Sequence, residues 1–360
     1  MKYYLINNNK KSFIEKNYIK IREKNYTIIM LKILIIFLIF IIGFIINYNK
    51  LHDKIYLKDK SNDYLIKNNM KYDYDNNKFI IIKKNSHSCG LFGFYVSFIG
   101  CIQIFISKGY IPIIDLSSLP NIFNGYNITS IDKNPWEIFF YQPYGYTLKN
   151  IIKKGKNIKF FECNLDPTKR PNSSTIFINN ILRNFWNNIA ENYIPIKKEI
   201  INEANNIRIN IFKGSDNVLG VLIRGTDYIA KKPKYHPIQP KAEIVLKDTK
   251  EMNNKNKYDF IFIATEDDLI RKKFIKEFRD NLKYIGGNKN IEYNYKKKQY
   301  LAFNKNIKGN INYLKNYLMS VIILSKCIDI ICSRTAGSVG VFILTKGFRN
   351  KKVYYLGSYK

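Results

Sequence analysis

The stretch VLIRGTDY, residues 221–228, shows how this chain is built. An apolar strand, Leu219–Ile223, ends abruptly in Arg224, Gly225 and Asp227. Strands that are apolar throughout, without alternation, are typical of parallel sheets that helices cover on both faces. The carboxyl ends of such strands are where α/β proteins bind ligands. The stretch therefore predicts both a fold class and the position of a site.

The pattern of strand followed by helix recurs on both sides of this stretch. We expect further strands at 79–82, 111–115, 260–264, 328–332 and 353–356, and helices at 88–107, 175–211, 240–254, 267–278, 313–326 and 336–344. Such alternation predicts an α/β protein with parallel sheets. We predict two Rossmann-like domains, 78–212 and 213–360, with a Lys/Asn-rich loop or insertion at 286–310.

The composition is basic but also apolar. There are 60 Lys and Arg against 28 Asp and Glu, which makes a formal net charge of +32, and 46% of the residues are hydrophobic. So apolar a chain is not disordered. The charge raises nucleic acid, anionic lipid and phosphorylated ligands as partners. Lys, Ile, Asn and Tyr are enriched along the whole chain, however, as a bias toward A/T-rich codons would produce, so much of the charge is predicted to be solvated surface.

The apolar run IIMLKILIIFLIFIIGFII occupies residues 28–46. A run of this length with one Lys can span a bilayer core, and it is longer than the apolar core of a cleaved signal peptide. We predict a cytoplasmic tail (1–27), a transmembrane anchor (28–46) and a polar stem (47–77). The Lys and Arg of the tail predict a single-pass type II protein. It would face the ER or Golgi lumen in a eukaryote, or be anchored in the inner membrane of a bacterium.

The five cysteines contain no CxxC pair, and the three histidines lie far apart in the sequence. A zinc site is therefore not expected. The odd number of cysteines argues against a disulfide framework. Cys101, Cys327 and Cys332 lie in apolar runs and are predicted to be buried thiols.

A second polar strand end is FIATEDD (262–268), which places Thr265, Glu266 and Asp267 after strand 260–264. These acids could hydrogen-bond a base or a ribose. Acids in the first turn of a helix also complement the helix dipole, and Thr265 could be an ordinary N-cap, so a structural role stays open.

A third polar strand end is CSRTAGSVG (332–340), where a strand runs into a helix. The junction contains Ser333, Arg334, Thr335, Gly337 and Ser338. Small hydroxyl residues and glycine let backbone N–H groups approach an anion, although a capped helix start would look the same.

The three strand ends together predict a site for a nucleoside diphosphate. The planar fork of Arg224 suits a pair of phosphates, although an ion pair with Asp227 would also account for it. Two of the three strand ends contain an Arg.

At these residues the chain resembles the fucosyltransferase-like glycosyltransferases of the GT-B type, which include α-1,6- and α-1,2-fucosyltransferases and protein O-fucosyltransferases. That family has a strand ending in H-x-R-[RG]-x-D, whose first Arg binds the β-phosphate of GDP-fucose. Arg224 and Asp227 match it, and Leu222 replaces the histidine. The family's Ala-Thr-Asp-Asp-like segment is matched by 264–267, and its last segment by Asp329 with 333–338.

The first half of the chain also resembles this group, in SCGLFG (88–93) and NPWEIFFYQPYGY (134–146). The resemblance covers roughly residues 79–357. It implies a GT-B-like fold and inverting, metal-independent transfer of fucose from GDP-fucose to a glycan or protein acceptor bound against these two segments. No cofactor and no metal are expected. The donor-binding residues it implies are Arg224, Thr265, Glu266, Asp267, Asp329, Ser333, Arg334, Thr335, Gly337 and Ser338.

The general base is not evident. Some members of the family have a catalytic Glu about eight residues after the Arg, where this chain has Lys232. Asp227 and His236 are the candidates, and with Arg224 they form the predicted catalytic set. Two alternatives remain: a basic, membrane-tethered protein that binds nucleic acid or another anionic polymer, and an inactive glycosyltransferase-like protein. For the enzyme, nucleic acid is not an expected partner.

Overall fold

The computed structural model describes residues 72–360 except 87–88, 126, 128, 287–292, 294, 296–299, 302–303 and 305–306. These residues belong to one compact unit, Met70–Lys360. No helix in this part of the chain is long and apolar enough to cross a membrane. The predicted tail (1–27), anchor (28–46) and most of the stem (47–77) lie outside the described residues.

The larger sheet has five parallel strands in the order β6-β5-β4-β7-β8. Its strands are β4 (Val218–Leu222), β5 (Phe260–Ala264), β6 (Leu282–Lys283), β7 (Asp329–Ser333) and β8 (Asn350–Tyr354). The central strand β4 is buried throughout, and its Val221 lies opposite Ile263 on one side and Ile331 on the other. The prediction of an α/β fold with parallel sheets is confirmed.

The smaller sheet has three parallel strands in the order β2-β1-β3. They are β1 (Lys78–Lys83), β2 (Ile111–Ile114) and β3 (Asn157–Glu162). We did not predict β3, and its position explains why. It is an edge strand with most of its residues exposed, so it lacks the apolar run that marks the buried strands.

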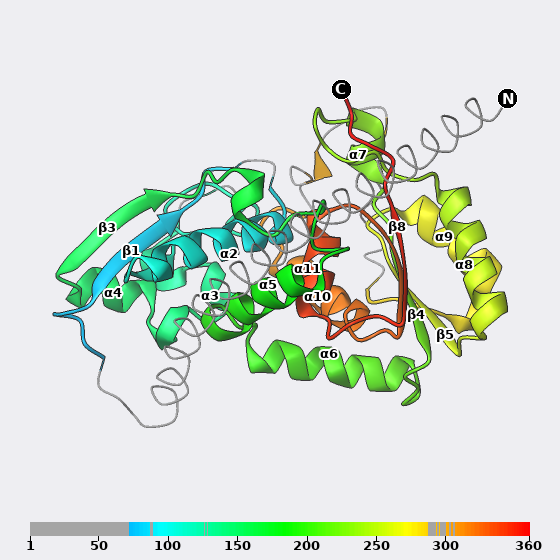
Figure 1. Cartoon of the computed structure of the whole chain (residues 1–360), viewed down its shortest axis with the longest axis horizontal. Helices are drawn as coiled ribbons and strands as arrows, with labels where there is room; N and C mark the ends of the chain where they lie inside the picture. The colour runs from blue at the N-terminus through cyan, green and yellow to red at the C-terminus, as the bar shows by residue number, and fades with distance from the viewer. Residues whose placement is uncertain are drawn as a thin grey trace, which may run out of the picture. The chain divides into compact units, whose positions relative to one another are not determined.

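Helices cover both faces of each sheet (Figure 1). The group that shares one apolar core with both sheets consists of α2 (Leu91–Ser107), α5 (Asn180–Tyr193), α6 (Lys198–Ile211), α10 (Ile311–Leu324) and α11 (Ala336–Leu344). Helices α8 (Ala242–Asn256) and α9 (Asp268–Phe278) pack on the opposite face of the five-stranded sheet, and α4 (Leu148–Lys154) on that of the three-stranded sheet.

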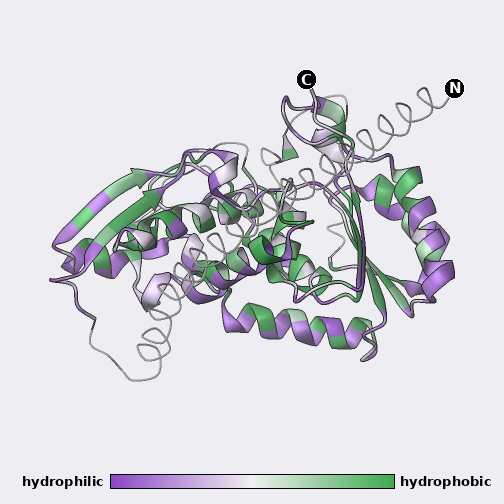
Figure 2. Cartoon of the chain, in the orientation of Figure 1, coloured by the Kyte–Doolittle hydropathy of each residue, from purple (hydrophilic) through white to green (hydrophobic). Residues whose placement is uncertain are grey.

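The helix predicted at 175–211 is two helices, α5 and α6, because Pro195 cannot continue a helix and separates them. The shorter helices α3 (Trp136–Phe139) and α7 (Thr226–Lys231) were not predicted. Figure 2 shows hydrophobic strands in the five-stranded sheet, whereas α6 and α8 have a hydrophilic face. The division into domains at 212/213 stays a prediction.

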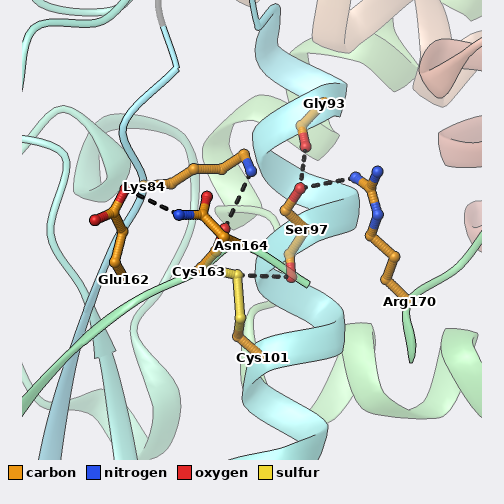
Figure 3. Close-up of a disulfide and its surroundings, with 8 residues drawn as sticks. All are labelled: Lys84, Gly93, Ser97, Cys101, Glu162, Cys163, Asn164 and Arg170. Atoms are coloured by element: carbon orange, nitrogen blue, oxygen red, sulfur yellow. Dashed lines mark hydrogen bonds between the residues drawn. A yellow bond between two sulfur atoms is a disulfide. The ribbon is translucent and has the colours of Figure 1, made fainter. Parts of the chain in front are cut away.

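We had predicted that Cys101 is a buried free thiol. This prediction is wrong, because Cys101 forms a disulfide with Cys163 (Figure 3). The bond joins α2 to the segment that follows β3, and both cysteines are fully buried. The pairing was missed because the two residues are 62 positions apart and only the parallel pairing of β1 with β3 brings them together. Cys327 and Cys332 are buried free thiols, as predicted.

Candidate functional site

A pocket lies at the carboxyl edge of the five-stranded sheet, where the sequence predicted it. Arg224 follows β4, and Thr265 and Glu266 follow β5. Helix α10 forms another wall with Tyr313 and Tyr317. Gly90 and Leu91, at the start of α2, line the pocket from the side of the three-stranded sheet. The two halves of the described chain therefore both contribute to one cleft.

The guanidinium of Arg224 lies between two carboxylates. Its Nη2 donates to Oδ1 of Asp227 at 2.9 Å, and its Nε lies 3.4 Å from Oε1 of Glu266. The ring of Tyr228 stacks on it, with 4.9 Å between Cζ and the ring centroid. Burial would lower the pKa of Arg224, but the two carboxylates raise it well above its ordinary value. The group is therefore a permanent cation in a fixed orientation.

Glu266 is one of the carboxylates that line the pocket. Its Oε1 accepts hydrogen bonds from the backbone N–H of Gly225 and the hydroxyl of Thr226, both at 2.9 Å. Burial raises the pKa of Glu266 above its usual range, although the charge of Arg224 lowers it. Glu266 thus anchors the turn after β4 while it orients Arg224.

The turn after β4 is tightly packed against Asp267. A Cβ at position 225 would overlap the carboxylate of Asp267, so Gly225 is required for space. Thr226 has a φ of +43°, in the left-handed region that a β-branched residue avoids. Its N–H donates to Asp267 at 3.3 Å, and this bond helps to hold the strained residue.

Asp267 itself is a helix cap. Its Oδ1 accepts from the N–H groups of Leu269 (2.9 Å) and Ile270 (3.3 Å) at the start of α9, and its Oδ2 accepts from the hydroxyl of Tyr295. Thr265, which we had considered as the cap, instead accepts from the N–H of Asp267 at 3.2 Å. Of the two predicted acids here, the structure places Glu266 at the pocket and uses Asp267 to build its wall.

Of the two predicted bases, Asp227 lines the pocket but both of its carboxylate oxygens are engaged, and His236 does not line the pocket. Asp227 is buried, and its Oδ2 accepts from the N–H of Leu301 at 3.1 Å while Oδ1 holds Arg224. His236 is exposed, its ring is nearly perpendicular to that of Tyr228 with 5.4 Å between centroids, and it is not among the residues that line the pocket. Asp227 therefore positions Arg224, whereas His236 contacts Tyr228, whose ring lies over Arg224.

The start of α11 is a complete capping box. Thr335 Oγ1 accepts from the N–H of Ser338, and Ser338 Oγ accepts from the N–H of Thr335. Ser338 Oγ also donates to the carbonyl of Ser333 at 2.6 Å. Thr335 lines the pocket. The hydroxyls of Thr335 and Ser338 thus build the helix start, and the helix N-terminus is presented to the pocket beside them.

Arg334 points elsewhere than predicted. Its guanidinium bonds to the hydroxyls of Ser173 (3.3 Å) and Ser174 (3.2 Å) and lies over the ring of Tyr355. It is not a lining residue of the pocket. Of the two strand-end arginines, only Arg224 serves the site.

Asp329 is a correction to the predicted donor set. It is the first residue of β7 and so lies at the amino end of the strand, opposite to the pocket. It is fully buried and accepts hydrogen bonds from Tyr258, Arg349 and Asn350. Burial would raise its pKa, but these hydrogen bonds outweigh it and hold the pKa below the ordinary value. Its role is structural.

Asp329→Asn is expected to destabilise the fold in a pH-dependent way. Because the folded-state pKa is lowered, the stabilisation is present above the unfolded-state pKa and is lost as the pH falls through the folded-state value. We expect a loss of about 3 kcal/mol at pH 7, the usual cost of breaking a buried pair. The deficit should shrink below the ordinary pKa of 3.8. Urea unfolding across pH measures it, with the exposed Asp280→Asn as control, and a deficit that does not change with pH would contradict it.

The two segments predicted to hold the acceptor differ. Segment 88–93 reaches the pocket through Gly90 and Leu91. Two polar side chains of 134–146 are used elsewhere, at the outer edge of β2. Gln142 bonds to both the N–H (2.9 Å) and the carbonyl (2.8 Å) of Ile114, and Asn134 donates to the same carbonyl at 2.7 Å. This segment seals an edge strand.

Sequence reasoning missed the tyrosines and the second arginine of the pocket. Tyr313 and Tyr317 are spaced four apart on α10, so they share a helix face. In a chain with 28 Tyr this spacing did not stand out. Arg271 pairs with Asp268 and lies over the ring of Tyr284, and all three line the pocket.

No group of three His, Cys, Asp or Glu side chains that could hold a metal ion occurs among the residues described.

No protein-family model and no curated protein match the sequence. Among solved structures, the chain is similar to the α-1,6-fucosyltransferase NodZ soaked with GDP-fucose, with 12% identity and a TM-score of 0.40 over 75% of this chain and 93% of that one. For NodZ from Bradyrhizobium the identity is 12% and the TM-score 0.41, over 75% of this chain and 93% of that one. For POFUT1 in complex with GDP-fucose the identity is 8% and the TM-score 0.46, over 77% of this chain and 98% of that one. All three TM-scores are below 0.5 and no identity exceeds 12%, so no residue role and no activity is transferred from these structures.

Proposed function

We propose that this chain is a membrane-anchored glycosyltransferase that moves a sugar from a nucleoside diphosphate to a glycan or protein acceptor with inversion. The observation that carries the proposal is Arg224. It is a permanent cation at the end of the central strand, and only one of its N–H groups is hydrogen-bonded to a described residue. The N–H groups that face neither Asp227 nor Glu266 suit phosphate oxygens. The resemblance of VLIRGTDY to the family strand favours GDP-fucose as the donor.

The chemistry that the pocket favours is stabilisation of the leaving group. In an inverting displacement, the bond from the sugar carbon to the β-phosphate oxygen breaks and its electron pair goes to the diphosphate. A base would stand on the opposite face of the sugar. Asp227 and Glu266 both contact Arg224 and so lie on the side of the leaving group. The main catalytic contribution that we assign to this site is therefore the fixed positive charge of Arg224 at the departing diphosphate.

The acceptor is proposed to enter from the side of the three-stranded sheet. Gly90 and Leu91 form that wall of the pocket. A position opposite Arg224 would place an acceptor hydroxyl on the far face of the donor sugar.

We propose that the protein is a type II membrane protein. Its unit Met70–Lys360 would lie in the ER or Golgi lumen of a eukaryote, or on the outer side of the inner membrane of a bacterium. The Cys101–Cys163 disulfide supports it, because disulfides persist in oxidising compartments and are rare in the cytosol.

The rival function, binding of nucleic acid or another polyanion, is not favoured by the pocket. Its lining contains two arginines, Arg224 and Arg271, against the three carboxylates of Asp227, Glu266 and Asp268. A surface that neutralises many phosphates needs an excess of cations. The net charge of +32 is therefore not concentrated at this site.

A screen of nucleotides against the full-length chain in detergent micelles tests the proposal. GDP at about 100 times its Kd should stabilise the fold by about 2.7 kcal/mol. UDP, CDP and ADP should have much smaller effects. An equal response to all four, or tight oligonucleotide binding that is lost in salt, would contradict it. Transfer or hydrolysis of GDP-fucose then distinguishes an active enzyme from an inactive relative.

A further inference from the structure

Tyr317 stands out among the residues of the pocket because of where its hydroxyl lies. A Cβ at position 337 would overlap this hydroxyl, so it lies directly over Gly337, in the first turn of α11. Tyr317 also lines the pocket together with Arg224. The hydroxyl therefore lies at the N-terminus of α11, and its residue shares the pocket with the cation.

The ring of Tyr317 is held by packing. It meets the ring of Phe92 edge to face, with 5.4 Å between centroids. Phe92 in turn packs against Gly340 of α11, where a Cβ would overlap its ring. Residues of α2, α10 and α11 thus fix the ring, and the hydroxyl has little freedom to move away.

The hydroxyl is a donor without a partner. No hydrogen bond to it is found in the part of the chain that the structure describes, and the same holds for the N–H groups of Ala336 and Gly337. Burial raises the pKa of Tyr317 above its usual range, although the charge of Arg224 lowers it, so the phenol keeps its proton. The unused hydroxyl of Tyr317 therefore lies beside the unused N–H groups at the start of α11, and Tyr317 and Arg224 line the same pocket.

We propose that Tyr317 donates a hydrogen bond to the β-phosphate of the departing nucleoside diphosphate and so stabilises the leaving group together with Arg224. This assignment rests on the proposed function. As the bond from the sugar to the phosphate oxygen breaks, the electron pair passes to the diphosphate. The acceptor oxygen bonds to the sugar carbon and releases its proton to solvent. Tyr317 keeps its own proton and only shares it with the phosphate oxygen, where the charge grows.

The test compares GDP with GMP, because only GDP has a β-phosphate. The full-length Tyr317→Phe variant keeps the ring that packs on Phe92 and loses only the hydroxyl. We expect its Kd for GDP to rise about 10- to 100-fold, the usual effect of losing a hydrogen bond to a charged group, and its Kd for GMP to stay unchanged. A role in packing would shift both values together.

Tyr95→Phe is the matched control. Tyr95 is buried and also packs against Phe92, with 5.7 Å between centroids, but does not line the pocket. It should bind GDP and GMP like the unaltered chain. Gly337→Ala is a second variant, because its methyl group occupies the position of the hydroxyl. It should lose GDP affinity at least as strongly, with GMP unaffected.

The possible outcomes distinguish a failure of the role of Tyr317 from a failure of the proposed function on which it rests. If the unaltered chain binds no nucleoside diphosphate, the proposed function fails and the role of Tyr317 with it. If the chain binds GDP and Tyr317→Phe binds it equally well, or loses GDP and GMP to the same extent, only the role of Tyr317 is overturned.

Discussion

Arg224→Ala is expected to weaken the binding of GDP by about 30-fold or more. The change removes the permanent cation of the pocket and leaves the carboxylates of Asp227 and Glu266 without their partner. Truncating one partner of a buried charge pair typically costs 2–5 kcal/mol, and each 1.4 kcal/mol is a factor of ten in affinity. Titration calorimetry with GDP and the full-length chain measures the loss.

Two further variants make this result specific. Arg224→Lys keeps the charge but not the planar fork, so its affinity for GDP should lie between that of the unaltered chain and that of Arg224→Ala. Arg271→Ala removes the other pocket arginine, which is already paired with Asp268, and should cost less than tenfold. An equal loss in Arg224→Ala and Arg271→Ala would show that the pocket senses only overall charge. The unfolding midpoint of each variant must be measured as well, because Arg224 also holds the turn after β4.

Removing the Cys101–Cys163 disulfide is expected to destabilise the fold by about 4 kcal/mol. The two residues are 62 positions apart, and closing a loop of this length restricts the unfolded chain substantially. Both positions are fully buried, so serine at either one also loses packing. Urea unfolding of the Cys101→Ser/Cys163→Ser double variant measures the loss.

Unfolding in the presence of a reductant measures the contribution of the same disulfide independently. The unaltered chain, unfolded in dithiothreitol, should approach the stability of the double variant, whereas the double variant itself should not respond. Cys332→Ser is the control for a buried thiol outside any disulfide, and its stability relative to the unaltered chain should be reduced to the same extent with and without reductant. If dithiothreitol leaves the unaltered chain unchanged under unfolding conditions, the assigned bond is absent.

The position of the pocket could be predicted because it depends on a local pattern. Parallel strands end at one edge of a sheet, so polar residues after apolar strands must meet there. Arg224, Thr265, Glu266 and Thr335 line the pocket for this reason. The same argument failed for Asp329, which precedes its strand core instead of following it, and therefore lies at the opposite edge.

Residues that act through distant partners could not be predicted in this way. Asn134 and Gln142 seal the edge of β2, and Asp267 braces Thr226, which precedes it by 41 positions. Each is an ordinary polar residue in the sequence. Its role follows from a backbone group that comes within hydrogen-bond distance only after the chain has folded.

The chain's amino-acid pattern was enough to establish its α/β class, its parallel sheets and the edge where its polar strand ends gather, because hydrophobic periodicity and strand direction are local properties. The folded chain was needed to show which side chains are free. In the fold, Asp227 and Asp267 accept hydrogen bonds in the wall of the pocket, and Arg334 bonds to a serine outside the pocket. The hydroxyl of Tyr317 on α10 lies over Gly337 of α11. Hydrogen-bond distance is a property of three-dimensional packing, and no spacing along the sequence contains it.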